Sequence, residues 1–247
     1  MGPTKEGLLV GGIGDITSGS CPLLEAEQDI FFRGRQVPNS FYTRHVTTTG
    51  PRRLGLLGGT FDPPHAGHLA AAVAVQTQVA LDELVLMVAN EPWQKVGDRL
   101  VTPAQVRFEM TKALVEGISG LLADDREIRR GGPTFTVDTL EEIHTEHPDT
   151  EIFLIVGADT ANRLETWHRA SDVVRLSTNV IVNRDDSTNA ASGFLRDARV
   201  VNVTMTPVDV SSSAIREAVA LGESIDSLTS SSVASIVRDR SLYVGQP

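Results

Sequence analysis

Short apolar runs alternate along the chain with longer stretches in which apolar residues recur every three or four positions. The short runs are typical of buried parallel strands, and the longer pattern is typical of amphipathic helices. Their alternation from residue 53 onward predicts an α/β fold, a doubly wound parallel sheet followed by a C-terminal helical part. The predicted strands span residues 54–58, 83–89, 121–123, 152–157, 179–183 and 199–205, and the predicted helices span residues 69–81, 103–116, 137–147, 162–176 and 213–221.

The first fifty residues differ from the rest of the chain. They are rich in Gly, Ser, Thr and Pro and show little periodicity, so we expect residues 1–50 to form a disordered N-terminal extension and residues 51–247 to form the folded domain. An apolar stretch follows Lys5, but Asp15 interrupts it, which makes a poor signal peptide.

Composition narrows the class of protein. Of the 247 residues, 40% are hydrophobic and 22% are charged, as in an ordinary globular protein, and no apolar run approaches the length of a membrane span. The net charge of −10 argues against a protein that binds nucleic acid through a basic surface. Cys21 is the single cysteine, so an intramolecular disulfide is excluded and we expect a cytoplasmic location. The sequence makes no prediction of the oligomeric state.

The stretch GGTFDPPHAGH, residues 58–68, lies between a predicted strand and a predicted helix. Gly58 and Gly59 predict a tight turn in which the backbone approaches a ligand. The helix that follows has unpaired N–H groups at its start, which favour an anion. His65 and His68 are three residues apart, so we expect them to meet on one side of the loop. The stretch therefore predicts a phosphate-binding site.

Other interpretations of this stretch are weaker. Two histidines could form half of a metal site, but no cluster of Cys, His or carboxylate residues completes it, so we predict no protein-held metal. The spacing is not that of a dinucleotide fingerprint, and no Walker lysine follows. The stretch resembles the GGxFDPxHxGH signature of nucleotidyltransferases, and specifically of nicotinate-nucleotide adenylyltransferases. The resemblance covers residues 53–243. It implies a Rossmann-like catalytic domain that binds ATP through Gly58, Gly59, Thr60, Phe61, His65 and His68.

Two further segments resemble motifs of this family. Residues 90–95 resemble its Pro-Pro-His-Lys stretch, which implies that Lys95 approaches a substrate phosphate; a solvated loop lysine is the alternative. Residues 131–140 resemble its G-P-S/T-Y-T-V-D-T-L segment, with Phe135 where tyrosine is common. That resemblance implies that Thr136 helps to hold a nicotinate carboxylate, and Thr136 is also a suitable N-cap for the helix that begins there.

The last two motifs complete the resemblance. Asp159 follows a predicted strand and precedes Thr166-Trp167-His168, as in the family, where the aspartate accepts hydrogen bonds from a ribose and the tryptophan stacks on a pyridine ring. An isolated tryptophan in a helix is otherwise more often a core residue. Residues 210–216 resemble the motif I-S-S-T-x-I-R. The resemblance implies a polyphosphate clamp made of Ser211, Ser212, Ser213 and Arg216.

Taken together, the resemblance implies transfer of AMP from ATP to nicotinic acid mononucleotide, which yields nicotinic acid adenine dinucleotide and pyrophosphate in NAD biosynthesis. It implies His65, His68 and Arg216 as the catalytic residues and Mg²⁺ bound as Mg-ATP. The alternatives are an adenylyltransferase for nicotinamide mononucleotide or phosphopantetheine, and a non-catalytic nucleotide-binding module. Phosphopantetheine enzymes have threonine at the position of His65, and a non-catalytic module would require a damaged phosphate site. We expect small-molecule partners only, and neither nucleic acid nor a membrane.

Overall fold

The computed structural model describes residues 50–92, 101–183 and 193–245. All of these residues belong to one compact unit of the chain, Val37–Pro247. Residues 1–49 of the predicted extension lie outside the described part.

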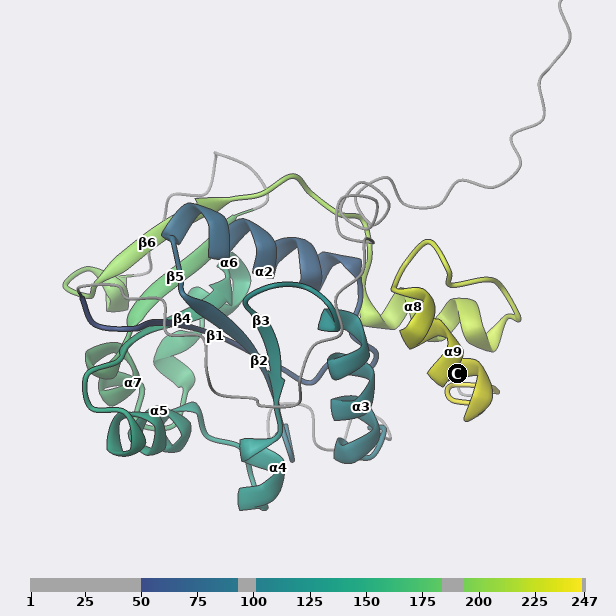
Figure 1. Cartoon of the computed structure of the whole chain (residues 1–247), viewed down its shortest axis with the longest axis horizontal. Helices are drawn as coiled ribbons and strands as arrows, with labels where there is room; N and C mark the ends of the chain where they lie inside the picture. Colours follow the sequence, from purple (N-terminus) through teal and green to yellow (C-terminus); the bar gives the residue numbers. More distant parts are fainter. Residues whose placement is uncertain (1–49, 93–100, 184–192, 246–247) are drawn as a thin grey trace, which may run out of the picture. The chain divides into compact units, whose positions relative to one another are not determined.

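Within the described residues, six parallel strands form one sheet in the order β3-β2-β1-β4-β5-β6 (Figure 1). The predicted doubly wound sheet is confirmed, because the chain adds strands on one side of β1 and then returns to add β4 on its other side. In sheets of this kind, ligands bind beyond the carboxyl ends of the strands at the point where the order reverses. The strands are β1 (Arg53–Gly59), β2 (Glu83–Val88), β3 (Leu121–Asp124), β4 (Glu151–Gly157), β5 (Thr178–Asn183) and β6 (Val200–Thr204).

Helices cover both faces of the sheet. Helix α2 lies along one face, and α5 and α7 lie along the opposite face, while α9 packs against α3 (Figure 1). The helices are α2 (Ala66–Val79), α3 (Ala104–Val115), α4 (Arg126–Arg130), α5 (Thr136–Glu146), α6 (Ala158–Ala161), α7 (Ala170–Leu176), α8 (Ser212–Ala220) and α9 (Ser231–Asp239), with short 3-10 turns η2 (Leu164–Thr166) and η3 (Gly193–Leu195).

One predicted helix is wrong. Where a continuous helix was expected over residues 162–176, the chain instead forms the short turn η2 and, after a break, the helix α7. The chain breaks at Arg169, whose φ of 50° lies in the left-handed region. The break leaves Trp167 in an extended conformation, packed against the hydrophobic core. Tertiary packing of this side chain overrides the helical pattern.

The core on the α5 face joins the centre of the sheet to the apolar side of α5. Leu56 of β1 and Leu154 of β4 are each 2% exposed, and Leu140 of α5 is fully buried. Burial of a leucine side chain of this kind contributes about 1.5–3 kcal/mol. The core therefore fixes α5 against β1 and β4, the two strands where the sheet order reverses.

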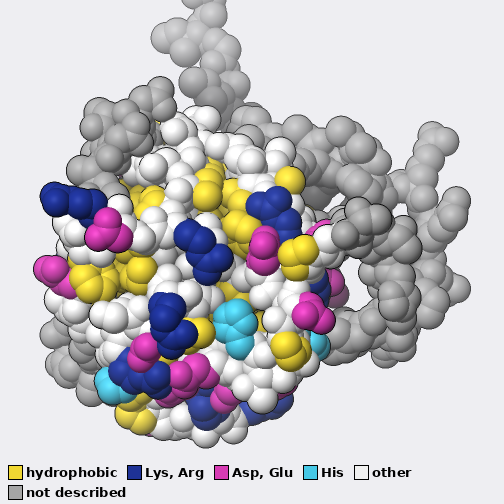
Figure 2. All heavy atoms as spheres, turned by 90° about the vertical axis from the view of Figure 1, so that its left-hand side faces the viewer, with side chains coloured by type: hydrophobic (Ala, Val, Ile, Leu, Met, Phe, Trp, Pro, Cys, Tyr) yellow, Lys and Arg dark blue, Asp and Glu magenta, His cyan; other side chains and the backbone are white. Residues whose placement is uncertain are grey.

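The surface carries both signs of charge. On the side shown in Figure 2, Lys and Arg side chains of the described residues are interspersed with Asp and Glu rather than gathered into one basic patch. No helix in the described part of the chain is long and apolar enough to cross a membrane.

Candidate active site

The loop after β1 carries the predicted phosphate motif. Both Gly58 and Gly59 belong to β1, so the predicted glycine turn is wrong. The turn instead uses Phe61, whose φ is 50° and whose side chain is 2% exposed. A Cβ on Gly59 would lie 2.7 Å from the Phe61 ring, so glycine is needed there to make room for that ring. Because the Phe61 ring is buried, its contribution to a ligand site is limited to its main chain.

His65 and His68 meet as predicted. Their ring centroids are 3.7 Å apart in a stacked arrangement, and Phe61 packs edge-on against His68 at 4.9 Å. His65 occupies the N-cap position of α2, and its backbone N–H donates to Nδ1 of His68 over 3.2 Å. In the neutral tautomer of His68 that accepts this bond, the hydrogen is on Nε2. The structure therefore sets up His68 Nε2–H as a hydrogen-bond donor.

The first turn of α8 lies against the same loop. Ser212 Oγ donates to the Pro63 carbonyl over 2.8 Å, and Arg216 Nη1 donates to the Asp62 carbonyl over 2.8 Å. Ser213 Oγ accepts from Arg216 Nη2 over 3.0 Å. The Ser211–Arg216 motif and the histidine loop, some 150 residues apart in sequence, thus form one polar cluster.

Two helices begin in this cluster, α2 at the histidine loop and α8 at Ser212. Neither has an acidic residue in its first turn. Ser211 caps α8 by accepting from the Ala214 N–H over 3.1 Å. Helix N-termini without nearby carboxylates favour phosphate groups, because their N–H groups and dipoles point toward the anion.

The C-terminal segment also contacts the loop. Thr229 Oγ1 donates to the Pro64 carbonyl over 2.9 Å, and the Ala66 N–H donates to the Leu228 carbonyl over 3.0 Å. Tyr243 Oη donates to Oδ1 of Asp62 over 2.7 Å, and both side chains are buried. Burial raises the pKa of Tyr243, so its hydroxyl remains a donor at neutral pH. Sequence analysis missed these contacts.

Replacing Tyr243 by phenylalanine removes the donor but keeps the ring. We expect the free energy of unfolding to fall by about 1–3 kcal/mol, because the buried Asp62 carboxylate loses a hydrogen bond. Urea denaturation measures the change. The matched control is Thr145→Val, which removes an exposed hydroxyl that bonds only the Glu141 carbonyl and is expected to cost no more than about 0.5 kcal/mol. A loss in Tyr243→Phe no larger than in this control would contradict the anchoring role.

A buried arginine holds the loop to the next strand. Arg107 of α3 is 1% exposed, and its guanidinium donates to four backbone carbonyls. The bonds to Thr60 and Ala89 are 2.7 Å long, and so is the bond to Thr102, while the bond to Asn90 is 2.8 Å. Arg107 therefore joins the ends of β1 and β2. No sequence motif indicated this role, although Arg107 lies in helical register with the apolar Met110 and Leu114.

A cavity of about 220 Å³ lies beyond the carboxyl ends of β1, β2 and β4. Its wall includes Gly58, Gly59 and Thr60 from the predicted ATP site and Thr136 and Trp167 from the predicted substrate site. Thr136 is the first residue of α5 and Phe135 occupies the N-cap position, so the predicted N-cap role of Thr136 is wrong. The structure thus brings these five predicted residues to one cavity, and Gly58–Thr60 in its wall lead along the chain into the histidine loop.

Aromatic rings form one side of the cavity. Trp167, Phe135 and His168 all line it, and the rings of Phe135 and His168 lie 4.5 Å apart. Trp167 is half-buried, because part of it packs against the core while part of it faces the cavity. An aromatic wall of this kind suits a flat ring of a ligand.

The remaining predicted residues lie elsewhere. Asp159 is exposed on α6, directly beyond the carboxyl end of β4, and the neighbouring residues Gly157 and Thr160 line the cavity. Lys95 lies outside the described residues. In the ranges 50–92, 101–183 and 193–245, no group of three or more His, Cys, Asp or Glu side chains is placed to hold a metal ion.

The parallel sheet, the paired histidines and the adjoining helix N-termini define a nucleotidyltransferase. Comparison with known proteins agrees, since residues 56–218 match the cytidylyltransferase-like family model.

Two bacterial relatives carry the name nicotinate-nucleotide adenylyltransferase. The protein of Methylibium petroleiphilum is 38% identical over 188 residues, which are 75% of this chain and 88% of the relative. That of Pseudomonas syringae pv. tomato is 36% identical over 214 residues, 79% of this chain and 96% of the relative. The chain therefore belongs to the nicotinate-nucleotide adenylyltransferases of the cytidylyltransferase-like family.

A solved structure shows the same fold. The nicotinic acid mononucleotide adenylyltransferase of Plasmodium falciparum, complexed with NaAD, superimposes with a TM-score of 0.66 at 16% identity. The match covers 78% of this chain and 97% of that one.

Proposed function

We propose that this chain transfers the adenylyl group of ATP to nicotinic acid mononucleotide, releasing pyrophosphate and forming nicotinic acid adenine dinucleotide in NAD biosynthesis, in the cytoplasm. One observation carries the proposal: the cavity lined by Trp167 and Thr136 also has in its wall Gly58–Thr60, the residues that lead directly into the histidine loop. A pyridine mononucleotide in the cavity would extend its phosphate toward the loop, where the triphosphate of ATP would be held.

In this reaction, a phosphate oxygen of the mononucleotide forms a bond to the α-phosphorus of ATP while the bond to the bridging oxygen of pyrophosphate breaks. A phosphate monoester is already largely ionised at pH 7, with a second pKa of about 6. No general base is therefore required. Catalysis depends on alignment of two anions and on donors that stabilise the charge moving onto the leaving group.

The polar cluster supplies those donors. In the proposal, His68 Nε2–H and His65 contact the phosphate groups between the two substrates, and Arg216 with Ser211, Ser212 and Ser213 holds the departing phosphates. Gly58–Phe61 offers main-chain contacts along the nucleotide. The contacts of Ser212 and Arg216 with the loop carbonyls support this arrangement, since they fix α8 beside the histidines.

The cavity supplies the substrate contacts. Trp167 stacks on the pyridine ring, and Thr136 at the start of α5 receives the carboxylate, where the helix dipole favours a negative charge. Asp159, beyond the end of β4, accepts hydrogen bonds from a ribose. Lys95 approaches the phosphate of the mononucleotide.

Mg²⁺ enters with ATP in this proposal. The acidic residue of the loop, Asp62, is 1% exposed, and its carboxylate accepts from Tyr243 and from the Thr102 N–H. The other polar groups of the cluster are imidazoles, hydroxyls and a guanidinium. This donor set fits a cation carried by phosphates and water rather than one held by carboxylates. When bound, the cation neutralises part of the triphosphate charge.

The test is pyrophosphate release from Mg-ATP with three acceptors in parallel: nicotinic acid mononucleotide, nicotinamide mononucleotide and 4′-phosphopantetheine. We expect strong preference for the acid. Equal use of acid and amide would contradict the carboxylate site at Thr136 but keep the chemistry. Activity with phosphopantetheine alone, or with none of the three, would overturn the proposed function.

A further inference from the structure

Glu127 is a buried acid in the wall of the substrate cavity. It belongs to α4 and is 6% exposed, and it lines the cavity together with Thr136, Thr139 and Trp167. Glutamate is almost never fully buried without a direct ionic partner. A carboxyl group in this place is unexpected, because the proposed ligand itself carries a carboxylate.

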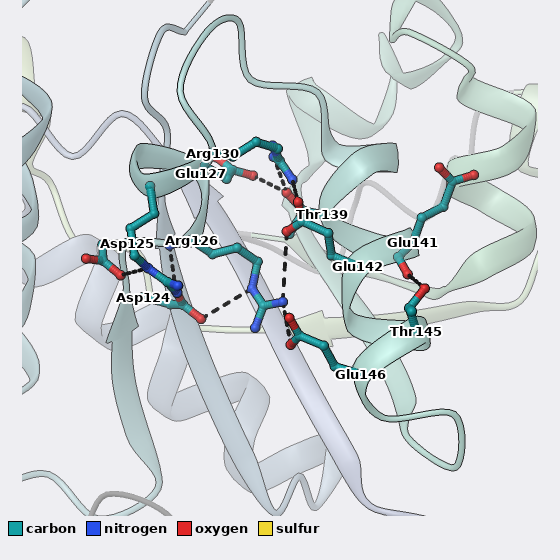
Figure 3. A network of polar contacts seen from close by, with 11 residues as sticks. Asp124, Asp125, Arg126, Glu127, Arg130, Thr139, Glu141, Glu142, Thr145 and Glu146 are labelled. Carbon is teal, nitrogen blue, oxygen red and sulfur yellow. Dashed lines mark hydrogen bonds and ion pairs between the residues drawn. The ribbon is translucent and has the colours of Figure 1, made fainter.

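The hydrogen bonds of Glu127 do not include an arginine (Figure 3). Thr139 Oγ1 donates to Glu127 Oε1 over 2.7 Å and accepts from Arg130 Nη2 over 2.8 Å. The Arg130 guanidinium is instead ion-paired with Glu142, with Nη1 and Oε1 2.9 Å apart. Arg130 is thus linked to Glu127 by hydrogen bonds through the threonine hydroxyl, and its charge acts on Glu127 from a greater distance.

The surroundings of Glu127 favour its uncharged form. Burial raises its pKa to about 7, and the negative charges of Asp124 and Glu142 act in the same direction. The Thr139 hydrogen bond and Arg130 lower the pKa by less. Among the residues that the structure describes, the other titratable group on the cavity wall is the exposed His168, which belongs to the segment after η2.

We propose that Glu127 is a specificity-determining residue of the substrate cavity, whose charge controls the affinity for the carboxylate of nicotinic acid mononucleotide. The inference rests on the proposed function. Two negative charges confined to a cavity of about 220 Å³ repel one another strongly. The uncharged Glu127 accommodates the ligand carboxylate, and the ionised Glu127 opposes it. The amide mononucleotide lacks this charge and is insensitive to the state of Glu127.

The affinity for nicotinic acid mononucleotide should therefore fall as the pH rises. Below pH 7 Glu127 is largely protonated and the acid binds well; as the pH rises through 7 the competent fraction of the enzyme falls and KM for the acid rises. By linkage, a bound carboxylate raises the pKa of Glu127 further, so binding takes up protons near pH 7.5.

The experiment measures KM for nicotinic acid mononucleotide and for Mg-ATP at pH 6.5, 7.5 and 8.5. In the wild type we expect KM for the acid to rise by about 25-fold over this range, as the protonated fraction of Glu127 falls, while KM for Mg-ATP changes little. Glu127→Gln keeps an acceptor for Thr139 and cannot ionise, so its KM for the acid should stay level. Glu146→Gln is the matched control: Glu146 pairs with Arg126 in the same network, is 52% exposed and is absent from the cavity wall, so this variant should behave as wild type.

If Glu127 served only to join α4 to α5, Glu127→Gln would lower the free energy of unfolding. Its KM for the acid would then show the same pH dependence as that of the wild type. A level KM in the wild type, or the wild-type profile in Glu127→Gln, would therefore overturn the inference. Absence of any turnover of the acid by the wild type would overturn the proposed function instead.

A second measurement needs no variant. Calorimetry of mononucleotide binding at pH 7.5, in two buffers of different ionisation enthalpy, counts the protons exchanged. We expect net proton uptake with the acid and none with the amide, which carries the same phosphate. Equal proton exchange with both ligands would contradict the role of Glu127 even if Glu127→Gln failed to fold.

Discussion

Replacing His68 by alanine is expected to lower kcat about 10²–10³-fold, the usual loss when one donor to a developing negative charge is removed. The structure gives the reason, because His68 Nδ1 accepts from the His65 N–H and the ring hydrogen is then on Nε2, a group that can donate to a phosphate oxygen. KM for both substrates should change much less, since the α2 and α8 N-termini and the cavity wall remain. Steady-state pyrophosphate release gives both constants.

Two further variants make this result specific. His68→Gln returns a side-chain N–H donor of similar reach, and we expect it to recover part of the lost kcat. His147→Ala removes an exposed histidine just after α5 and should leave kcat unchanged. Turnover of His68→Ala within a few-fold of the wild type would show that the imidazole does not contact the transferring phosphate.

The second large effect concerns stability. Replacing Arg107 by leucine is expected to reduce the free energy of unfolding by about 3–5 kcal/mol. Four backbone carbonyls would lose a charged donor inside the protein, and each buried acceptor left without a partner costs about 1–3 kcal/mol before the structure relaxes. Because Thr60 and Ala89 are the points where Arg107 joins β1 to β2, the cavity wall should also loosen. Urea denaturation and KM for the mononucleotide report the two effects.

Arg129→Leu is the matched control for Arg107. Arg129 lies on α4 with 66% of its side chain exposed and pairs with Asp125, so the same substitution there should cost no more than about 1 kcal/mol. If the free energy of unfolding fell equally in the two variants, the four carbonyls would have found other hydrogen-bond partners in the absence of Arg107.

The order of elements and the phosphate motif could be predicted because both depend on short stretches of sequence. Strands and helices follow from local periodicity, and the prediction that His65 meets His68 follows from a spacing of three residues. The approach of the 210–216 motif to the loop followed from the family pattern.

Contacts between distant residues could not be predicted in this way. Nothing near Tyr243 indicates that its hydroxyl bonds Asp62, which is 181 positions earlier. Arg107 offered a signal, as a charged residue on an apolar helix face, but not the identity of its four carbonyl partners. Likewise, the helical pattern of residues 162–176 continues through Trp167, and only packing against the cavity and core explains why the helix breaks.

The C-terminal segment anchors the histidine loop, and this affects the order in which the nascent chain folds. The ribosome makes Asp62 long before Tyr243, so the nascent chain carries the histidine motif while its anchors at Thr229 and Tyr243 are still missing. Contacts of such long sequence separation form late and slowly. The histidine loop therefore gains its full set of anchors only after the segment that carries Thr229 and Tyr243 has been made and has folded against it.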